Sequence, residues 1–368
     1  MKYYLVAGEA SGDLHGANLI KALKAEDASA SFRYFGGDKM KAEGGHLVKH
    51  YADMAFMGFT EVVMNLRAIL RNMKACKADI LTYQPDTLVL IDFPGFNLKI
   101  AEFAKKQGIK VCYYISPKIW AWNQKRVLKI KRDVDQMYCI LPFEVDFYKK
   151  WGMEVHYVGN PLLDEKANFT PDLNFQNKLE LGDQKIIALL PGSRKQEIER
   201  LLPDMLTITE KFPTYQFVIA AAPTFSPEYY YQFIGDKKVK LVFSQTYNLL
   251  QNAHAALVAS GTATLETALF KVPQVVLYRG GAISVGIARM VIKIRFISLV
   301  NLIMDRKVVT ELIQEDCNTE KIAASLSDIV EGVERNKMLA DYDELNTMMG
   351  TAGASERTAK LIVNFLRN

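Results

Sequence analysis

The chain has 368 residues, which is more than one compact core usually holds, so two domains are predicted. Hydrophobic residues make up 49% and charged residues 24%, a balance that fits a globular protein and excludes a disordered or fibrous chain. The formal net charge of +5 suits contact with anionic ligands or an anionic surface, but it is far too small for a typical nucleic-acid-binding protein.

The four cysteines, Cys76, Cys112, Cys139 and Cys317, are scattered and form no C-x-x-C pair. This spacing indicates neither a zinc site nor a redox motif, and it fits a reducing compartment. The first apolar run, residues 3–7, is too short for a signal peptide, and no run approaches the ~20 apolar residues of a membrane span. We therefore expect a cytoplasmic protein that at most lies on a membrane surface.

Short apolar runs that read as buried parallel strands alternate with helical patterns along the chain. This alternation predicts open, doubly wound α/β sheets. A polar segment at 167–182 is interpreted as the linker between two such units, and residues 355–368 are predicted to form a helix with one apolar face. The expected strands are 2–7, 87–91, 110–115, 136–141, 185–190, 216–220, 240–243, 255–259 and 274–278.

Ligands of open α/β sheets bind beyond the carboxyl ends of the strands, so the residues that follow each strand are the candidates for a site. The first strand ends in the string GEASGDLHGA, which places Glu9, Asp13 and His15 together. A plain strand-to-helix turn with Ser11 or Asp13 as N-cap explains the spacing equally well. The crowding of two acids and a histidine favours a site.

A second strand ends in IDFPGFN, so Asp92 follows four apolar residues directly. A carboxylate there can serve as a general base or simply as a turn residue before the Pro-Gly pair, and the spacing alone does not choose. The next strand is followed by a loop with two of the three tryptophans and a basic run. Aromatic faces can pack on sugars or acyl chains and cations can hold a phosphate, so we interpret the loop as an acceptor site with Ser116, Trp120, Trp122 and Arg126.

In the second half, LPGSR turns Arg194 and the following helix-start amides towards the end of a strand, an arrangement that suits a diphosphate. The string ASGTATLE reads as strand, small-residue turn and helix. Small side chains at 260–263 allow a phosphate to approach the backbone amides, and Glu266 could accept bonds from two ribose hydroxyls. The turn is formed by Ser260, Gly261, Thr262 and Ala263, and weaker donor-site candidates are Arg279, Asn301 and Gln314.

In order and spacing, the strings GEASGDLHGA, IDFPGFNL, YYISPKIWAW, LPGSR, ASGTATLE and SLVN…ELIQ resemble those of the lipid-A-disaccharide synthase family over essentially the whole chain. The resemblance implies the GT-B architecture, in which two Rossmann-like domains with doubly wound parallel sheets face a cleft and the last helix crosses back to the first domain. The implied boundaries are 1–166 for an acceptor- and membrane-facing domain, 167–352 for a UDP-sugar-binding domain and 353–368 for the returning helix.

The same resemblance implies a reaction. A UDP-linked 2,3-diacylglucosamine would be joined to 2,3-diacylglucosamine 1-phosphate, with inversion, to give a β-1,6-linked disaccharide 1-phosphate and UDP. By position, Arg194, Ser260, Thr262, Glu266, Asn301 and Gln314 match the donor side, and Glu9, Ser11, Asp13 and Asp92 match the acceptor and catalytic side. No metal and no cofactor are expected, and the expected location is the cytoplasmic face of the inner membrane.

Two alternatives remain open at this stage. UDP-N-acetylglucosamine 2-epimerases share the architecture and a UDP site, and a non-catalytic UDP-sugar-binding protein on a membrane is also possible. We choose Asp92 as the general base, with Glu9 or Asp13 as positioning groups, because Pro94-Gly95 follow Asp92 and weaken its reading as a helix cap.

A membrane-facing helix is also predicted in the first domain. Apolar residues recur at helical spacing next to a basic stripe, after an apolar lead-in at 54–59, so the helix could lie in the interface of an anionic membrane. An ordinary amphipathic helix packed on its own sheet is a serious alternative. The apolar residues are Val62, Val63, Leu66, Ile69, Leu70 and Met73, and the basic ones are Arg67, Arg71 and Lys74.

Overall fold

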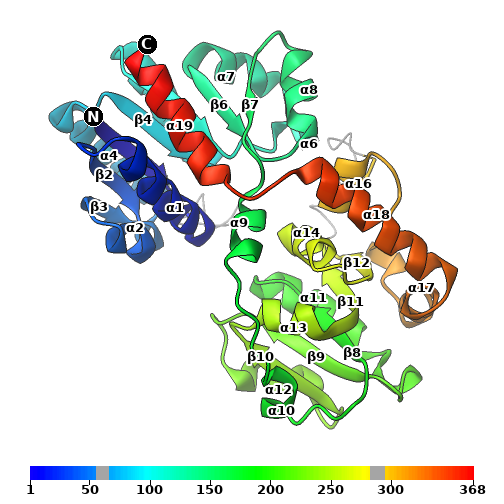
Figure 1. Ribbon diagram of the computed structural model, residues 1–368. Helices are drawn as coiled ribbons and strands as arrows, with labels where there is room; N and C mark the ends of the chain where they lie inside the picture. The colour runs from blue at the N-terminus through cyan, green and yellow to red at the C-terminus, as the bar shows by residue number, and fades with distance from the viewer. Residues whose placement is uncertain (55–65, 282–294) are drawn as a thin grey trace. The chain divides into compact units, whose positions relative to one another are not determined.

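The computed structural model describes residues 1–54, 66–281 and 295–368. The chain forms two compact units, one of Met1–Glu165 with Thr351–Asn368 and the other of Lys166–Gly350 (Figure 1). Each unit has a single sheet in which every described strand pair is parallel, with helices between the strands. The prediction of two doubly wound α/β units with parallel sheets is confirmed.

The first unit contains a seven-stranded sheet with the order β3-β2-β1-β4-β5-β6-β7. From β1 the chain adds strands towards one edge of the sheet, and from β4 it adds them towards the other edge. Its strands are β1 (Lys2–Ala7), β2 (Ser31–Gly36), β3 (His46–His50), β4 (Thr87–Ile91), β5 (Lys110–Tyr114), β6 (Gln136–Cys139) and β7 (His156–Tyr157). Its helices are α1 (Ala10–Glu26), α2 (Asp38–Ala42), α4 (Leu66–Tyr83), α5 (Pro94–Lys106), α6 (Ile119–Trp122), α7 (Val127–Asp133), α8 (Phe143–Lys149), α9 (Pro161–Ala167, which ends two residues into the other unit) and α19 (Ala354–Arg367), with 3₁₀ turns at Tyr51–Asp53 and Gln124–Arg126.

Both faces of this sheet are buried, because alternate strand residues enter two separate apolar clusters. On one face Tyr4, Val6 and Leu90 pack with side chains of α4, α5 and α7. On the other face Leu5 and Ile91 pack with α1 and with the last helix, α19. The C-terminal helix therefore belongs to the first unit, where it lies beside α1 (Figure 1).

The second unit repeats the plan with six strands in the order β10-β9-β8-β11-β12-β13. Its strands are β8 (Ile186–Leu190), β9 (Gln216–Ala221), β10 (Val239–Phe243), β11 (Ala253–Ala259), β12 (Gln274–Tyr278) and β13 (Thr310–Ile313). Its helices are α10 (Phe175–Lys178), α11 (Lys195–Leu206), α12 (Pro227–Ile234), α13 (Thr246–Asn252), α14 (Thr262–Leu269), α16 (Leu299–Met304), α17 (Thr319–Val330) and α18 (Val333–Met349), with 3₁₀ turns at Thr209–Lys211 and Gln314–Asp316.

Each of the nine expected strands is present, with ends that differ by at most two residues. Four strands were not expected, namely β2, β3, β7 and β13. Three of these are edge strands or their neighbours that carry polar residues such as Arg33, His46 and Lys49, so their sequences lack a long apolar run. The fourth, β7, is only two residues long.

Candidate active site

The carboxyl ends of β1, β4 and β5 lie side by side in the first unit. Ala7 is paired in register with Ile91, and Ile91 with Tyr114. Glu9 follows β1 and Asp92 follows β4, so the two carboxylates extend from neighbouring strands. Helix α1 begins at Ala10 with Glu9 at the N-cap position, which places Ser11 and Asp13 inside its first turn and not at the N-cap.

Backbone contacts fix the position of Asp92. Its φ angle is +43° and that of Phe93 is +48°, so two consecutive non-glycine residues have left-handed backbone conformation. The Asp92 carbonyl oxygen accepts hydrogen bonds from the Tyr113 hydroxyl at 2.5 Å and from the Asn97 side-chain amide at 2.8 Å. The Asp92 N–H donates to the Tyr114 carbonyl at 3.0 Å. The strained turn is therefore held from both sides.

The charge state of Asp92 suits a general base. Burial raises the pKa of Asp92 to about 6, the nearby Lys118 ammonium opposes that rise, and the negative charge of Glu9 adds to it. At neutral pH most of this carboxyl group is ionised, yet its affinity for a proton is higher than that of an exposed aspartate. A base of this kind is well matched to a reaction near pH 7.

A close contact explains the first glycine of the GEASGD string. A Cβ atom on Gly8 would lie only 2.2 Å from the Phe93 ring, so only glycine fits where the turns after β1 and β4 meet. Gly16 and Gly36 both pack against Met40 in the same manner. Gly8 lets the turns after β1 and β4 approach each other, whereas Gly16 and Gly36 make room for Met40 of α2, and none of the three needs a bound ligand to account for it.

Asp13 is fully engaged by the protein itself. It is 3% exposed, and its carboxylate accepts backbone N–H bonds from Gly37 at 2.7 Å, Lys39 at 3.0 Å and Met40 at 3.1 Å. These are the free N–H groups at the start of α2, so Asp13 stabilises that helix. We therefore leave Asp13 out of the reacting groups proposed below.

His15 lies on α1, and its Nδ1 atom is buried with no hydrogen-bond partner among the described residues. Burial lowers the pKa of His15 to about 4, against the opposing charge of Asp164. The imidazole is therefore neutral at pH 7. Ser11, one turn earlier, is exposed.

The tryptophan loop divides into a buried part and an exposed part. Ser116 is buried against the Tyr148 hydroxyl at 2.9 Å, and Trp120 is 7% exposed. Trp122, in contrast, is 45% exposed, and the Arg126 guanidinium lies 4.4 Å from the centre of its ring. Of the four candidates in this loop, Ser116 and Trp120 are buried, Trp122 is exposed and Arg126 is partly exposed.

In the second unit, the small-residue turn follows β11. The Ser260 hydroxyl donates to the Ile297 carbonyl at 3.1 Å, and Thr262, the first residue of α14, is exposed. Helix α14 has no side-chain N-cap; in its first turn the Thr264 N–H donates to the carbonyl of the capping residue, Gly261, at 3.2 Å. A Cβ on Gly261 would meet nothing within 4 Å, so the surrounding protein does not require glycine there.

Three further donor-site candidates lie on the strand ends and helix next to this turn, namely Arg194, Glu266 and Gln314. Because Val258 pairs with Leu190, the turn after β8 that carries Arg194 lies at the same sheet edge. The Glu266 carboxylate on α14 accepts a hydrogen bond from the Tyr247 hydroxyl at 3.1 Å. Gln314 directly follows β13 and binds the Gly280 N–H at 3.1 Å.

Arg194 has a partner within the protein. It caps α11, and its side chain is 63% exposed and lies 3.2 Å from Glu197. The unfavourable placement of a cation at a helix start therefore does not by itself require a ligand, contrary to our argument from sequence. An exposed ion pair of this kind is weak.

Two donor-site candidates have structural contacts instead. Asn301 is completely buried, and its side-chain amide binds Val308, Val309 and Glu311 at 2.7–2.9 Å, so it holds the segment before β13 in place. Arg279 donates to the Cys317 carbonyl at 2.6 Å and pairs with Asp204 at 3.0 Å. Neither side chain is directed to the small-residue turn by any contact in the structure.

Lys118 is a site residue that sequence reasoning did not assign. In the stretch 111–120 it alone is exposed, and it lies near enough to Asp92 to influence that carboxylate. Its position directly after β5 and beside the tryptophans was the available signal.

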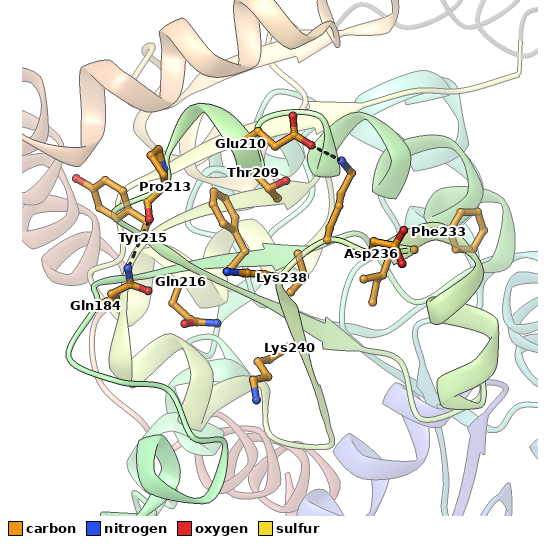
Figure 2. A pocket seen from close by; sticks show the side chains of 15 residues that line it. Gln184, Thr209, Glu210, Pro213, Tyr215, Gln216, Phe233, Asp236, Lys238 and Lys240 are labelled. Carbon is orange, nitrogen blue, oxygen red and sulfur yellow. Dashed lines mark hydrogen bonds and ion pairs between the residues drawn. The ribbon is translucent and has the colours of Figure 1, made fainter.

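A pocket of about 1050 Å³ lies elsewhere in the second unit (Figure 2). Gln216 and Phe217 at the start of β9, and Val239 and Lys240 at the start of β10, line it. These are the amino ends of the strands, opposite to the edge that carries the candidate donor residues. Acidic groups also offset its basic ones, since Lys237 pairs with Glu210 at 3.2 Å, and the pocket is not the candidate active site.

Among the described residues, no three His, Cys, Asp or Glu side chains gather as they would around a metal ion. Within the same residues, none of the helices has both the length and the apolar character of a membrane span.

Two Rossmann-like units with candidate sites at their strand ends define the GT-B class, which contains glycosyltransferases and UDP-sugar epimerases. A UDP-GlcNAc 2-epimerase from Neisseria meningitidis bound to UDP-GlcNAc has a TM-score of 0.66 at 15% identity and covers 100% of both chains. The glycosyltransferase of kitacinnamycin has a TM-score of 0.70 at 13% identity and covers 99% of both. At these identities the likeness concerns the fold alone.

Sequence comparison separates the two kinds of GT-B protein. The family profile described as Lipid-A-disaccharide synthetase matches residues 3–364. A lipid-A-disaccharide synthase from Syntrophus aciditrophicus is 41% identical over 372 residues, which cover 99% of this chain and 97% of the relative. The chain belongs to the lipid-A-disaccharide synthetase family and is a glycosyltransferase, and the epimerase alternative is not favoured.

Proposed function

We propose that this chain transfers 2,3-diacylglucosamine from UDP to the 6-hydroxyl of 2,3-diacylglucosamine 1-phosphate. The products are the β-1,6-linked disaccharide 1-phosphate and UDP. The observation that carries the chemical part of this proposal is the Asp92 carboxylate, held at the end of β4 beside Glu9 with its pKa raised to about 6. Family membership supports the choice of substrates.

In the proposed mechanism, Asp92 removes the proton of the acceptor 6-hydroxyl as its oxygen attacks the anomeric carbon of the donor. The bond from that carbon to the diphosphate oxygen breaks, and UDP leaves with the electron pair. A single displacement converts the α-linked donor into a β-linked product, so no protein nucleophile is needed; inverting glycosidases use a carboxylate in the same way to activate the attacking group. Glu9, on the neighbouring strand end, is assigned to hold acceptor hydroxyls.

The second unit is assigned to the nucleotide. The N–H groups at the start of α14 and the Arg194 guanidinium are the groups proposed to take up the diphosphate charge as UDP departs. Glu266 is assigned to the ribose hydroxyls, since a carboxylate can accept from two of them. Gln314 lies at the same sheet edge as a further candidate contact.

Residues around the Asp92 turn are assigned to the acceptor. Trp122 is exposed and Arg126 beside it is partly exposed, so an aromatic face and a cation are available for a sugar and its phosphate. Ser11 and the neutral His15 of α1 lie near the same strand ends. Ser116 and Trp120 support the loop from inside.

Peripheral membrane contact is proposed through α4. Leu66 and Leu70 are each 51% exposed, beside the exposed Arg67, Arg71 and Lys74, while Cys76 and Ile80 face the core. This combination of apolar and basic side chains fits an anionic membrane surface. Met73 and Met54, which we had placed on the membrane face, are buried. Val62, Val63 and the rest of the lead-in, residues 55–59, lie outside the described residues.

A direct assay tests the function against its alternatives. The purified chain is incubated with UDP-2,3-diacylglucosamine, with or without 2,3-diacylglucosamine 1-phosphate, and the products are analysed by mass spectrometry. Disaccharide 1-phosphate together with UDP, formed only when the acceptor is present, is the expected result. Acceptor-independent epimerisation of UDP-N-acetylglucosamine would support an isomerase, and UDP binding without any turnover would support a non-catalytic role.

A further inference from the structure

The start of α8 contains a carboxylate that has no part in the mechanism above. Glu144 is 1% exposed, and its Oε2 atom accepts backbone N–H bonds from Ile140 at 3.2 Å and Leu141 at 3.0 Å. These contacts fix the turn between β6 and α8. Two N–H bonds account for one carboxylate oxygen and leave the other for a different partner.

The other oxygen of Glu144 binds the tryptophan loop. Glu144 Oε1 accepts a hydrogen bond from Trp120 Nε1 at 3.2 Å, and the Trp120 ring packs edge-on against Phe143 with 4.9 Å between the ring centres. Because both partners of this hydrogen bond are buried, breaking it would leave an unpaired polar group without access to water. Trp120 is therefore restrained both in position and in ring orientation.

A second contact holds the other end of the same loop. The Ser116 and Tyr148 hydroxyl groups lie 2.9 Å apart, and both residues are buried. Tyr148 is on α8, one turn after Glu144. Helix α8 thus anchors the loop at Ser116 and again at Trp120.

Lys118 lies midway between these two anchors. It is exposed while its neighbours Pro117 and Ile119 are buried, so only its side chain leaves the packed part of the loop. Lys118 follows β5, where Tyr114 is paired in register with Ile91, the residue directly before Asp92, so its loop lies next to the Asp92 turn. Its positive charge opposes the burial-induced rise in the pKa of Asp92, and Glu9 acts in the opposite direction. Tyr113 also faces Asp92, but it binds the backbone carbonyl and not the carboxylate.

We propose that Glu144 is a positioning residue for the transfer reaction, and that it acts by holding the Trp120 loop so that Lys118 stays beside Asp92. This inference rests on the role of Asp92 in the proposed function. It assigns to α8 the task of setting how readily the base accepts its proton, although no residue of α8 is among the groups assigned to the substrates.

The pH dependence of kcat/KM provides the test, because its acidic limb reports the protonation of the base in the free enzyme. Burial also raises the pKa of Glu144 to about 7, so the variants that keep Glu144, Lys118→Met and Trp120→Phe, separate a shift of Asp92 from the titration of Glu144 itself. Lys118→Met removes the charge directly and should move the midpoint of that limb to higher pH by about half a unit or more, which is about threefold in rate below the midpoint. Glu144→Gln cannot accept from Trp120 and from the backbone amides at once, and it should shift the midpoint in the same direction. Trp120→Phe keeps the ring contact but removes the donor, and it should do likewise.

Asp146→Asn is the matched control, because Asp146 lies on the same helix and is exposed. It should leave the midpoint where it is. If Glu144→Gln is too unstable to purify, Trp120→Phe decides the question by the same readout. The double variant Glu144→Gln/Lys118→Met should show the shift of Lys118→Met and no more, since both changes remove the same interaction.

An unchanged midpoint in Trp120→Phe and Glu144→Gln, with only a lower melting temperature or a uniform loss of rate, would overturn the inference while leaving the proposed function intact. An unchanged midpoint in Lys118→Met would overturn it as well. If the wild-type chain forms no disaccharide, or if Asp92→Asn keeps near-native kcat, the proposed function or its base fails first, and the inference fails with it.

Discussion

Asp92 and Phe93 adopt backbone conformations that non-glycine residues avoid, and for a bulky residue such as Phe93 the cost is considerable. The turn persists because the Tyr113 hydroxyl and the Asn97 amide bind its carbonyl oxygen and the Phe93 ring packs on Gly8. Strain that neighbouring groups hold in place is typical of functional positions. Here it keeps a carboxylate at the end of β4.

Asp92→Asn preserves the size of the side chain and removes its basicity. We expect kcat to fall by roughly 10²–10⁴-fold, the usual contribution of a general base. UDP affinity should not change, since the groups assigned to UDP belong to the other unit. Steady-state kinetics together with calorimetry of UDP binding measure the two quantities. If kcat stays near-native while Glu9→Gln abolishes it, the base must be Glu9.

The same substitution has a consequence for stability that depends on pH. The pKa of Asp92 is raised to about 6 in the fold, above the ~3.9 of an unfolded chain, so the protonated form favours folding below pH 4 and this contribution is lost as the pH rises through 6. At pH 8 the wild type therefore bears the cost of a buried charge, and Asp92→Asn should raise the free energy of unfolding by about 1–3 kcal/mol. Near pH 4 the difference should vanish. Denaturant unfolding at both pH values measures it, and an equal effect at the two would contradict the raised pKa.

Glu266→Ala tests the nucleotide site at the residue scale. Removing a carboxylate that accepts from ribose hydroxyls should weaken UDP binding by about 1–3 kcal/mol, as seen by calorimetry. The variant also deprives the Tyr247 hydroxyl of its acceptor, so Tyr247→Phe is the matched control. That control removes the internal hydrogen bond but leaves the carboxylate. Equal UDP affinity in Glu266→Ala and the wild type would exclude Glu266 from the site.

At the scale of elements, α4 presents two different faces. Met73, Cys76 and Ile80 pack into the core, while Leu66 and Leu70 stay exposed among basic residues. One side of α4 therefore packs on its own sheet, as the alternative interpretation of the sequence predicted. The apolar residues at the helix start are not used by the described core.

Leu70→Glu should abolish sedimentation with anionic vesicles while leaving the melting temperature unchanged, because it places a charge in the proposed membrane surface and not in the core. Leu81, which is 48% exposed near the other end of α4, offers the matched variant Leu81→Glu. That variant should bind vesicles as the wild type does. Loss of binding in both variants, or in neither, would argue against this surface.

At the scale of the whole molecule, the sequence predicted the repeated β-α plan because buried parallel strands leave continuous apolar runs. It also located the carboxyl ends that carry Glu9, Asp92 and the turn at Ser260. It could not predict which of the polar groups near these ends form hydrogen bonds within the protein. Asp13 binds N–H groups 24 to 27 residues away, and the Trp120 indole binds a carboxylate 24 residues away. Such contacts depend on tertiary packing and have no local signature.

The return of α19 to the first unit affects the order in which the two units can fold during synthesis. Helix α19 packs on α1, Arg357 donates to the Val158 carbonyl at 2.7 Å, and the Lys110 ammonium contacts the Phe365 carbonyl. On the ribosome these partners emerge long before α19 does, and the whole second unit is synthesised in between. That unit, continuous in sequence, can complete its core during translation, whereas the unit that holds Asp92 must wait, with part of one apolar face uncovered, until α19 has been synthesised.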